Sequence, residues 1–153
     1  MPPVALRHDL WLLQGKCCLY TGDGLSDPAF TKSGISLDHM VPWARARVSS
    51  VENFVVTDIP TNSAKQHMLL SPALVGRWAD HVAARGTEAA SLARSYGWPT
   101  DLNRVVTIAA AMYRRATPAT PTWAGVRHIT PLGQSGRQQV LARLTQLGAP
   151  LYE

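Results

Sequence analysis

The amino-acid sequence predicts an α+β fold, in which a β-rich segment with one helix is followed by a helical region. Two runs rich in β-type residues, at 35–41 and 54–57, are followed directly by a helix start at Asp58 and Pro60. From residue 71 onward, apolar residues recur at helical spacing, and prolines and glycines interrupt the pattern. Strands in one part of a chain and helices in another are typical of the α+β class.

The first half is expected to begin with a helix over 4–14. Leucines recur on one side of this segment, and Gly15 supplies a stop signal. A short apolar run at 17–20 leads into a glycine-rich turn, and residues 22–34 are expected to form a loop.

Alternating apolar residues predict the strands, and a capping residue predicts the start of the helix after them. Apolar residues and His39 alternate on one face of 35–41, which suits a strand that ends before Pro42. A polar loop at 44–52 leads to the second strand. Asp58 is a suitable N-cap, and the helix after it is expected to extend from Thr61 to Leu69.

The second half is expected to be helical throughout. One helix should open at Ser71, a shorter one should cover 88–96, and Asp101 can cap a third over 102–115. Ser135 has capping-box spacing to the glutamine three residues later, so the last helix is expected to start there.

Length favours a single domain over 1–153, with a core at 16–70 and a helical extension at 71–153. No apolar run approaches the roughly 18–20 residues that cross a bilayer, and charges near the N-terminus argue against a signal peptide. The adjacent Cys17 and Cys18 cannot staple distant segments. We therefore expect a cytoplasmic protein without a membrane partner.

The positive charge lies in the second half. Residues 1–70 contain six Lys or Arg and six Asp or Glu, whereas residues 71–153 contain nine arginines and four acids, which gives the whole net charge of +5. Arginine pairs well with phosphate oxygens, so this imbalance suits a nucleic-acid partner. A solvated arginine-rich surface is the alternative.

Polar residues that could carry chemistry gather between residues 37 and 65. Asp38 and His39 lie on the first strand, Asn53 heads the second, and Asn62 lies in the first turns of the helix. Carboxylate and amide oxygens suit Mg²⁺, and a neutral imidazole beside the metal can take a proton from water. Neighbouring residues of a regular strand face opposite sides, so the site requires a bent strand end or a side chain that reaches around an edge.

These residues resemble the ββα-metal motif of HNH endonucleases. The stretches DHMVPW, ENFVVTD and TNSAK are similar to words of that family, and His39 precedes Asn53 by 14 residues and Asn62 by 23. The resemblance covers residues 16–70 and is typical of the variant in which the final histidine is an asparagine. It implies a ββα-metal motif packed against the helical C-terminal region.

The resemblance also implies a role for each matching residue. His39 would be the general base, and Asp38 and Asn62 would bind the metal ion. Asn53 would hold the loop between the strands and orient His39. Lys65, three residues after Asn62 and so on the same helical face, would contact phosphate.

One departure from the family concerns zinc. Many HNH domains hold a structural zinc with two cysteine pairs, but here Cys18 is followed by Leu-Tyr-Thr, and Thr61 stands at the helix-side position. Four thiolates cannot be assembled from Cys17 and Cys18, so we predict no structural zinc. The helical half is then expected to brace the motif by packing.

The predicted function is that of a metal-dependent HNH endonuclease that hydrolyses phosphodiester bonds in DNA, with Mg²⁺ or Mn²⁺. Arg45 and Arg47 could grip backbone phosphate, although both could equally be solvated loop residues. Trp43 is expected to be a packing anchor and His67 a surface residue. Two alternatives stay open, a non-cleaving nucleic-acid-binding module and an effector that depends on a specificity subunit or a second copy.

Overall fold

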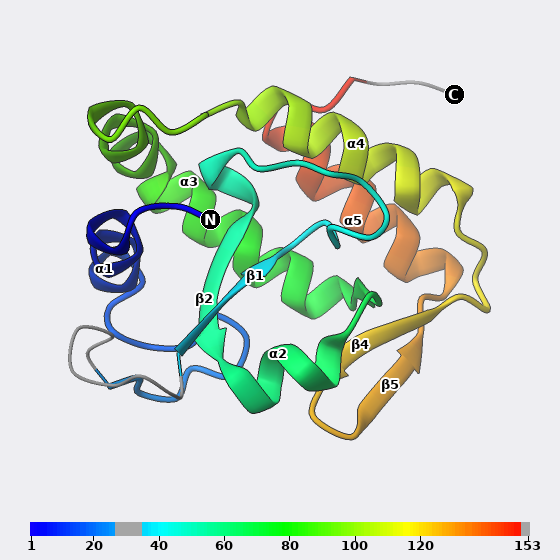
Figure 1. Ribbon diagram of the computed structural model, residues 1–153. Coiled ribbons are helices and arrows are strands. Elements are labelled where there is room, and N and C mark those ends of the chain that lie inside the picture. The colour runs from blue at the N-terminus through cyan, green and yellow to red at the C-terminus, as the bar shows by residue number, and fades with distance from the viewer. Residues whose placement is uncertain (27–34, 151–153) are drawn as a thin grey trace.

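The computed structural model describes residues 1–26 and 35–150, and it combines helices with short strands as expected for an α+β fold (Figure 1). The helices are α1 (Val4–Leu13), α2 (Ile59–Lys65), α3 (Pro72–Ser95), α4 (Leu102–Arg115) and α5 (Gln134–Gln146), with a 3₁₀ turn η1 (Val51–Asn53). The strands are β1 (Ile35–His39), β2 (Phe54–Asp58), β3 (Leu69–Leu70), β4 (Pro121–Gly125) and β5 (His128–Pro131). Part of the loop expected at 22–34 lies outside the described residues.

The strands β1 and β2 form an antiparallel pair, and α2 follows β2 without a loop. His39 is paired with Phe54 and Ile35 with Asp58. The Asp58 carboxylate accepts a hydrogen bond from the Thr61 N–H at 2.7 Å, which confirms the predicted cap. Figure 1 shows α2 beside the lower end of the two strands, so strand, strand and helix form one compact unit.

The helix α2 is shorter than the sequence predicts. It ends at Lys65, because Gln66 has a positive φ of 53° that a helix does not continue through. Leu69 and Leu70 then form β3, which pairs in parallel with Thr122 and Trp123 of β4. The predicted helix over Thr61–Leu69 is therefore wrong in its last turn.

A strand hairpin interrupts the second half, which the sequence predicted to be helical throughout. The strands β4 and β5 are antiparallel, and with β3 they make a three-stranded sheet (Figure 1). The sequence predicts that Pro118 and Pro121 break the chain between helices, but Pro121 begins β4. The hairpin depends on a long-range contact, because β4 pairs with β3, which lies about fifty residues earlier in the chain.

Two expected helix boundaries are also wrong. The helix α3 is a single element of 24 residues that continues through Gly86, where two helices were expected. Ala89 and Ala93 are buried beyond that glycine, and this packing outweighs the ~1 kcal/mol that a helical glycine costs. The helix α5 starts after Gly133, whose φ is 73°, so Ser135 lies inside the first turn and caps nothing.

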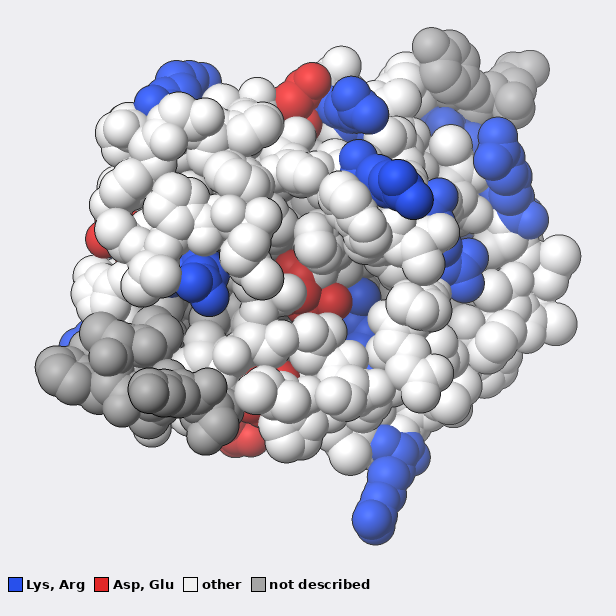
Figure 2. All heavy atoms as spheres, in the orientation of Figure 1, with Lys and Arg blue, Asp and Glu red and all other residues white. Residues whose placement is uncertain are grey.

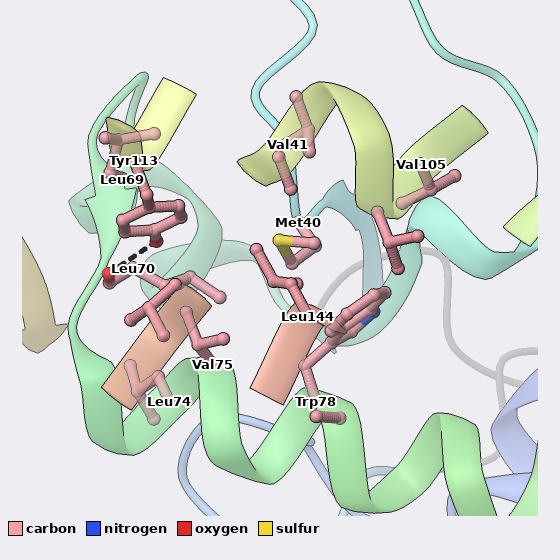
Figure 3. Close-up of a cluster of buried hydrophobic side chains, with 14 of the residues drawn as sticks. Met40, Val41, Leu69, Leu70, Leu74, Val75, Trp78, Val105, Tyr113 and Leu144 are labelled. Carbon is pink, nitrogen blue, oxygen red and sulfur yellow. Dashed lines mark hydrogen bonds between the residues drawn. The ribbon is translucent and has the colours of Figure 1, made fainter. Parts of the chain in front are cut away.

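The main core lies between the ββα unit and the C-terminal helices (Figure 3). Met40 and Val41, directly after β1, pack among side chains of α3, α4 and α5 such as Trp78, Val105 and Leu144. The Tyr113 hydroxyl of α4 donates a hydrogen bond to the Leu70 carbonyl at 2.7 Å. The helical region thus packs against the residues that directly follow β1 and α2.

A second apolar cluster joins α1 to β2 and α3. It is built on Leu6, Leu10 and Trp11 from α1, with Phe54 from β2 and Ala93 from α3 among their partners. In the described parts of the chain, no helix combines the length and apolar character that crossing a membrane requires.

Candidate active site

A pocket of about 490 Å³ opens where β1 ends beside α2. Asp38, His39 and Asn62 line it together, so the structure brings three predicted site residues to one place. Trp43 and His67 contribute to its wall. Figure 2 shows acidic and basic atoms side by side in a hollow at the middle of this face.

Asp38 is buried, with 6% of its surface exposed, and its carboxylate has two strong partners. The Tyr20 hydroxyl donates a hydrogen bond to Asp38 Oδ2 at 2.6 Å, and Lys65 Nζ lies 3.0 Å from the same oxygen. Burial, reinforced by the Asp38 charge, raises the pKa of Tyr20 well above its ordinary value, so Tyr20 stays a hydrogen-bond donor. These contacts fix the carboxylate at the edge of the pocket.

Lys65 is fully buried, which corrects the picture of a lysine that reaches phosphate. Besides its ion pair with Asp38, its ammonium donates a hydrogen bond to the His39 carbonyl at 2.9 Å. Burial lowers the pKa of Lys65, while the Asp38 carboxylate counteracts this shift. Lys65 therefore holds the end of β1 from inside, and its ammonium is out of reach of a phosphate in solvent.

His39 is half-buried among aromatic rings at the end of β1. The centroid of its ring lies 5.4 Å from that of Trp43 and 5.1 Å from that of Phe54. Burial lowers the pKa of His39, with Asp38 opposing the shift and Lys65 adding to it. The imidazole is therefore neutral at neutral pH, the form that can accept a proton.

The end of β1 explains how neighbouring residues share one pocket. Asp38 faces the buried Tyr20 and Lys65, whereas His39 faces the ring cluster, as the alternation of a strand requires. The strand ends at His39, and the chain bends at Met40 and Val41. Both side chains consequently line the same hollow from different sides.

Asn53 is fully buried and holds the loop that follows β1. Its Oδ1 accepts a hydrogen bond from the Val41 N–H at 2.7 Å, and its Nδ2 donates to the carbonyls of Val41 and Val48, both at 3.1 Å. Its own carbonyl accepts a bond from the Met40 N–H, at 2.8 Å. Asn53 thus acts on the backbone next to His39 and does not touch the pocket itself.

Asn62 and Asp38 are the oxygen donors that could hold a metal ion. The Asn62 amide nitrogen donates to Ser36 Oγ at 2.6 Å, so the amide oxygen remains the atom suited to a cation. Mg²⁺ keeps several waters and needs only one or two protein ligands. Within residues 1–26 and 35–150 no group of three His, Cys, Asp or Glu side chains could hold a metal.

Arg45 and Arg47 are exposed in the loop after β1. The Arg45 Nε–H donates a hydrogen bond to the His67 carbonyl at 2.8 Å, which holds this arginine near a residue of the pocket wall. Figure 2 shows Lys and Arg gathered on the upper right of the face, over this loop and α4. Exposed arginines of these two elements are Arg45, Arg47, Arg104 and Arg115.

The cysteines take ordinary positions in the first half. Cys18 is buried and its Sγ lies 2.9 Å from Thr57 Oγ1, whereas Cys17 is partly exposed. Thr61 is buried at the start of α2. The absence of a structural zinc stays a prediction.

The sequence analysis did not assign three residues to the site that the structure places there. Tyr20 could not be predicted as a site residue, because no sequence pattern indicates that the turn after α1 lies next to Asp38. Trp43 is 45% exposed, so its expected role as a packing anchor is wrong. His67 is exposed as expected, yet it lines the pocket.

Comparison with known proteins bears on residues 18–69, which match the family model described as HNH endonuclease. The matched segment contains β1, β2 and α2, together with the candidate site residues described above. No curated protein and no solved structure matches the chain. A domain of this kind indicates a nuclease-type function on nucleic acid. Residues 18–69, about a third of the chain, are thus similar to the HNH endonuclease family.

Proposed function

We propose that the protein is a metal-dependent endonuclease that hydrolyses phosphodiester bonds, with DNA as its substrate. The observation that carries this proposal is the meeting of Asp38, His39 and Asn62 in one pocket. A proton acceptor and two hard oxygen donors are the groups that such a hydrolysis requires.

His39 is the general base in this proposal. Its lowered pKa keeps the imidazole neutral at neutral pH, so a ring nitrogen can take the proton of a water molecule. The oxygen of that water then attacks phosphorus in line, and the bond to the leaving oxygen breaks. Phe54 and Trp43 restrict the ring from two sides, and Lys65 fixes the backbone of the same residue.

Asp38 and Asn62 would hold Mg²⁺ or Mn²⁺ at the pocket. A divalent ion bound there supplies positive charge against the charge that develops on the phosphate and the leaving oxygen. Tyr20 and Lys65 are positioning residues, since their contacts with Asp38 Oδ2 fix the carboxylate. Asn62 is oriented in the same way by Ser36.

The charge distribution supports a nucleic-acid substrate. The exposed arginines Arg45 and Arg47 lie in the loop after β1 and can bind backbone phosphate. One such site cleaves one strand, so a double-strand break requires two copies or two visits.

A supercoiled-plasmid assay tests the proposal. Wild-type protein is expected to nick the plasmid with Mg²⁺ or Mn²⁺ and to lose this activity in EDTA. His39→Ala should reduce the rate by about 10²–10⁴-fold, the usual contribution of a general base. His128→Ala, in an exposed histidine of β5, is the matched control and should cleave like wild type.

The outcomes separate the proposal from its alternatives. Equal cleavage by His39→Ala and wild type would contradict the assignment of His39. Salt-dependent plasmid binding without cleavage in either metal would identify a binding module instead. Cleavage that appears only after a second protein is added would identify a partner-dependent effector.

A further inference from the structure

His39 forms a wall of a second pocket, with a volume of about 340 Å³. Trp43 belongs to both pockets, whereas Phe54 and Trp98 line only the second. The second pocket therefore begins where the proposed active site ends. The proposed metal ligands Asp38 and Asn62 do not line it.

Four rings follow one another along this wall. The ring of Trp43 contacts that of His39 at a centroid distance of 5.4 Å, and His39 contacts Phe54 at 5.1 Å. Phe54 in turn contacts Trp98 at 6.0 Å. These distances are typical of interacting aromatic pairs, so the pocket has a continuous aromatic side.

Three of the rings are held firmly from behind. Phe54 is 8% exposed and packs in the second apolar cluster with α1. The Trp98 indole N–H donates a hydrogen bond to the Ser49 carbonyl at 2.8 Å, which fixes the ring across the pocket. His39 is restricted by the contacts described above. The aromatic surface is thus formed before any ligand arrives.

Trp43 differs from the other rings because 45% of its surface is exposed. It lies on the turn after Pro42, where the Arg45 N–H bonds to the Pro42 carbonyl at 2.9 Å. Leaving so large an apolar side chain in water forfeits burial free energy. Exposed aromatic surface beside a concave site is typical of ligand binding.

We propose that this second pocket binds one unpaired nucleobase of the substrate, next to the phosphate that is cleaved. The inference rests on the proposed nuclease function, because His39 joins the base pocket to the pocket of Asp38 and Asn62. Every base has a flat π-face that stacks on tryptophan, so the site needs no particular base. The exposed Arg47, four residues after Trp43, adds charge for the backbone of such a strand.

The geometry of the duplex limits the substrate. A base inside a duplex is covered on both faces by its neighbours and cannot stack on Trp43 until it leaves the helix. The preferred substrate is therefore single-stranded nucleic acid, or a duplex with an unpaired position. A fully paired duplex should bind through its phosphates alone and more weakly.

Binding in EDTA tests the base pocket without cleavage. The probes are a fluorescein-labelled single-stranded oligothymidylate, a duplex of equal length, and that duplex with one unpaired thymine. Wild type should bind the first and third probes more tightly than the second, with quenching of tryptophan fluorescence. Trp43→Ala should weaken those two complexes by about fivefold or more, the value of one base stack, and Trp43→Phe should restore most of the affinity.

Leu12→Ala is the matched control, since Leu12 is 44% exposed on α1 and lines neither pocket. Equal binding of all three probes, or unchanged affinity of Trp43→Ala, would overturn the base pocket, and plasmid nicking by the same protein would leave the nuclease function standing. Base binding that depends on Trp43 without cleavage in Mg²⁺ would instead contradict the nuclease function alone.

Discussion

Asp38, on β1, and Lys65, on α2, form an ion pair that is shielded from water. Removing two charges from water is costly, and the pair offsets that cost only because further hydrogen bonds complete it. Tyr20 supplies one of these bonds to the carboxylate, and the His39 carbonyl accepts another from the ammonium. The stability of the fold and the position of the site thus depend on the same few atoms.

Lys65→Met tests this dependence, because it removes the cation and keeps most of the side-chain volume. The variant should lower the free energy of unfolding by about 3–5 kcal/mol, since Asp38 is left as an uncompensated buried charge. Adding Asp38→Asn should recover a large part of the loss. Urea unfolding of the single and double variants measures both changes.

The control is Lys16→Met, in an exposed lysine after α1 whose ammonium lies 5.5 Å from the centre of the Trp11 ring, and it should change the free energy of unfolding by about 1 kcal/mol or less. If Lys65→Met were as stable as wild type, the Lys65 ammonium would not compensate the buried charge of Asp38. A double variant no more stable than Lys65→Met would show that the two residues do not interact.

Sequence spacing predicts the members of the site better than their surroundings. His39 and Asn62 were predicted by their separation along the chain, and they line the same pocket. The burial of Lys65 could not be predicted, because the helical spacing that puts it near Asn62 does not reveal that β1 closes over it. The exposure of Trp43 depends equally on tertiary packing.

At the scale of elements, α3 and α5 pack closely at Gly136. A Cβ atom placed on this residue would lie 2.8 Å from Pro72 Cγ at the start of α3, closer than carbon atoms can approach. A second glycine, Gly76, lies inside α3 with nothing within 4 Å of such an atom. A methyl group would therefore clash with a neighbour at Gly136 but would fit without contact at Gly76.

Alanine at each glycine should shift stability in opposite directions. Gly136→Ala should destabilise the protein, because overpacking costs about 1–3 kcal/mol and exceeds the helix propensity gained. Gly76→Ala should stabilise it by about 0.5–1 kcal/mol, because alanine loses less backbone conformational entropy than glycine when the helix forms. Thermal unfolding of both variants measures the difference, and equal shifts would contradict the close approach of α3 and α5.

Elements with strong local signals were predicted well and those held by distant partners were not. The helix α4, capped by Asp101, has the predicted bounds, and β2 is longer than expected by only one residue. The strand β3 has two residues and exists through its pairing with β4, so no local pattern could reveal it. The continuity of α3 likewise depends on packing beyond Gly86.

At the scale of the whole molecule, apolar packing braces the ββα unit. Met40 and Val41 continue β1 into the main core, where α3, α4 and α5 cover them. Cys17 and Cys18 are the only cysteines of the chain, too few for a zinc site of four thiolates. The fold should therefore need no metal, although the proposed reaction does.

Metal removal is expected to separate stability from activity. EDTA should abolish plasmid cleavage and leave the midpoint of thermal unfolding unchanged in protein without added Mg²⁺. Both measurements are made on the same preparation. A large drop of the midpoint would reveal a structural ion, because such ions contribute directly to folding.

The pairing of β3 with β4 has a consequence during synthesis. The residues of the proposed active site have all been translated by position 67, but Leu69 and Leu70 pair with residues 122 and 123. At about 5–20 residues per second, the ribosome needs several more seconds to deliver that partner strand. The emerging chain therefore carries the side chains of the proposed site before the framework that supports them, and a fully supported site has to wait until β4 has left the ribosome.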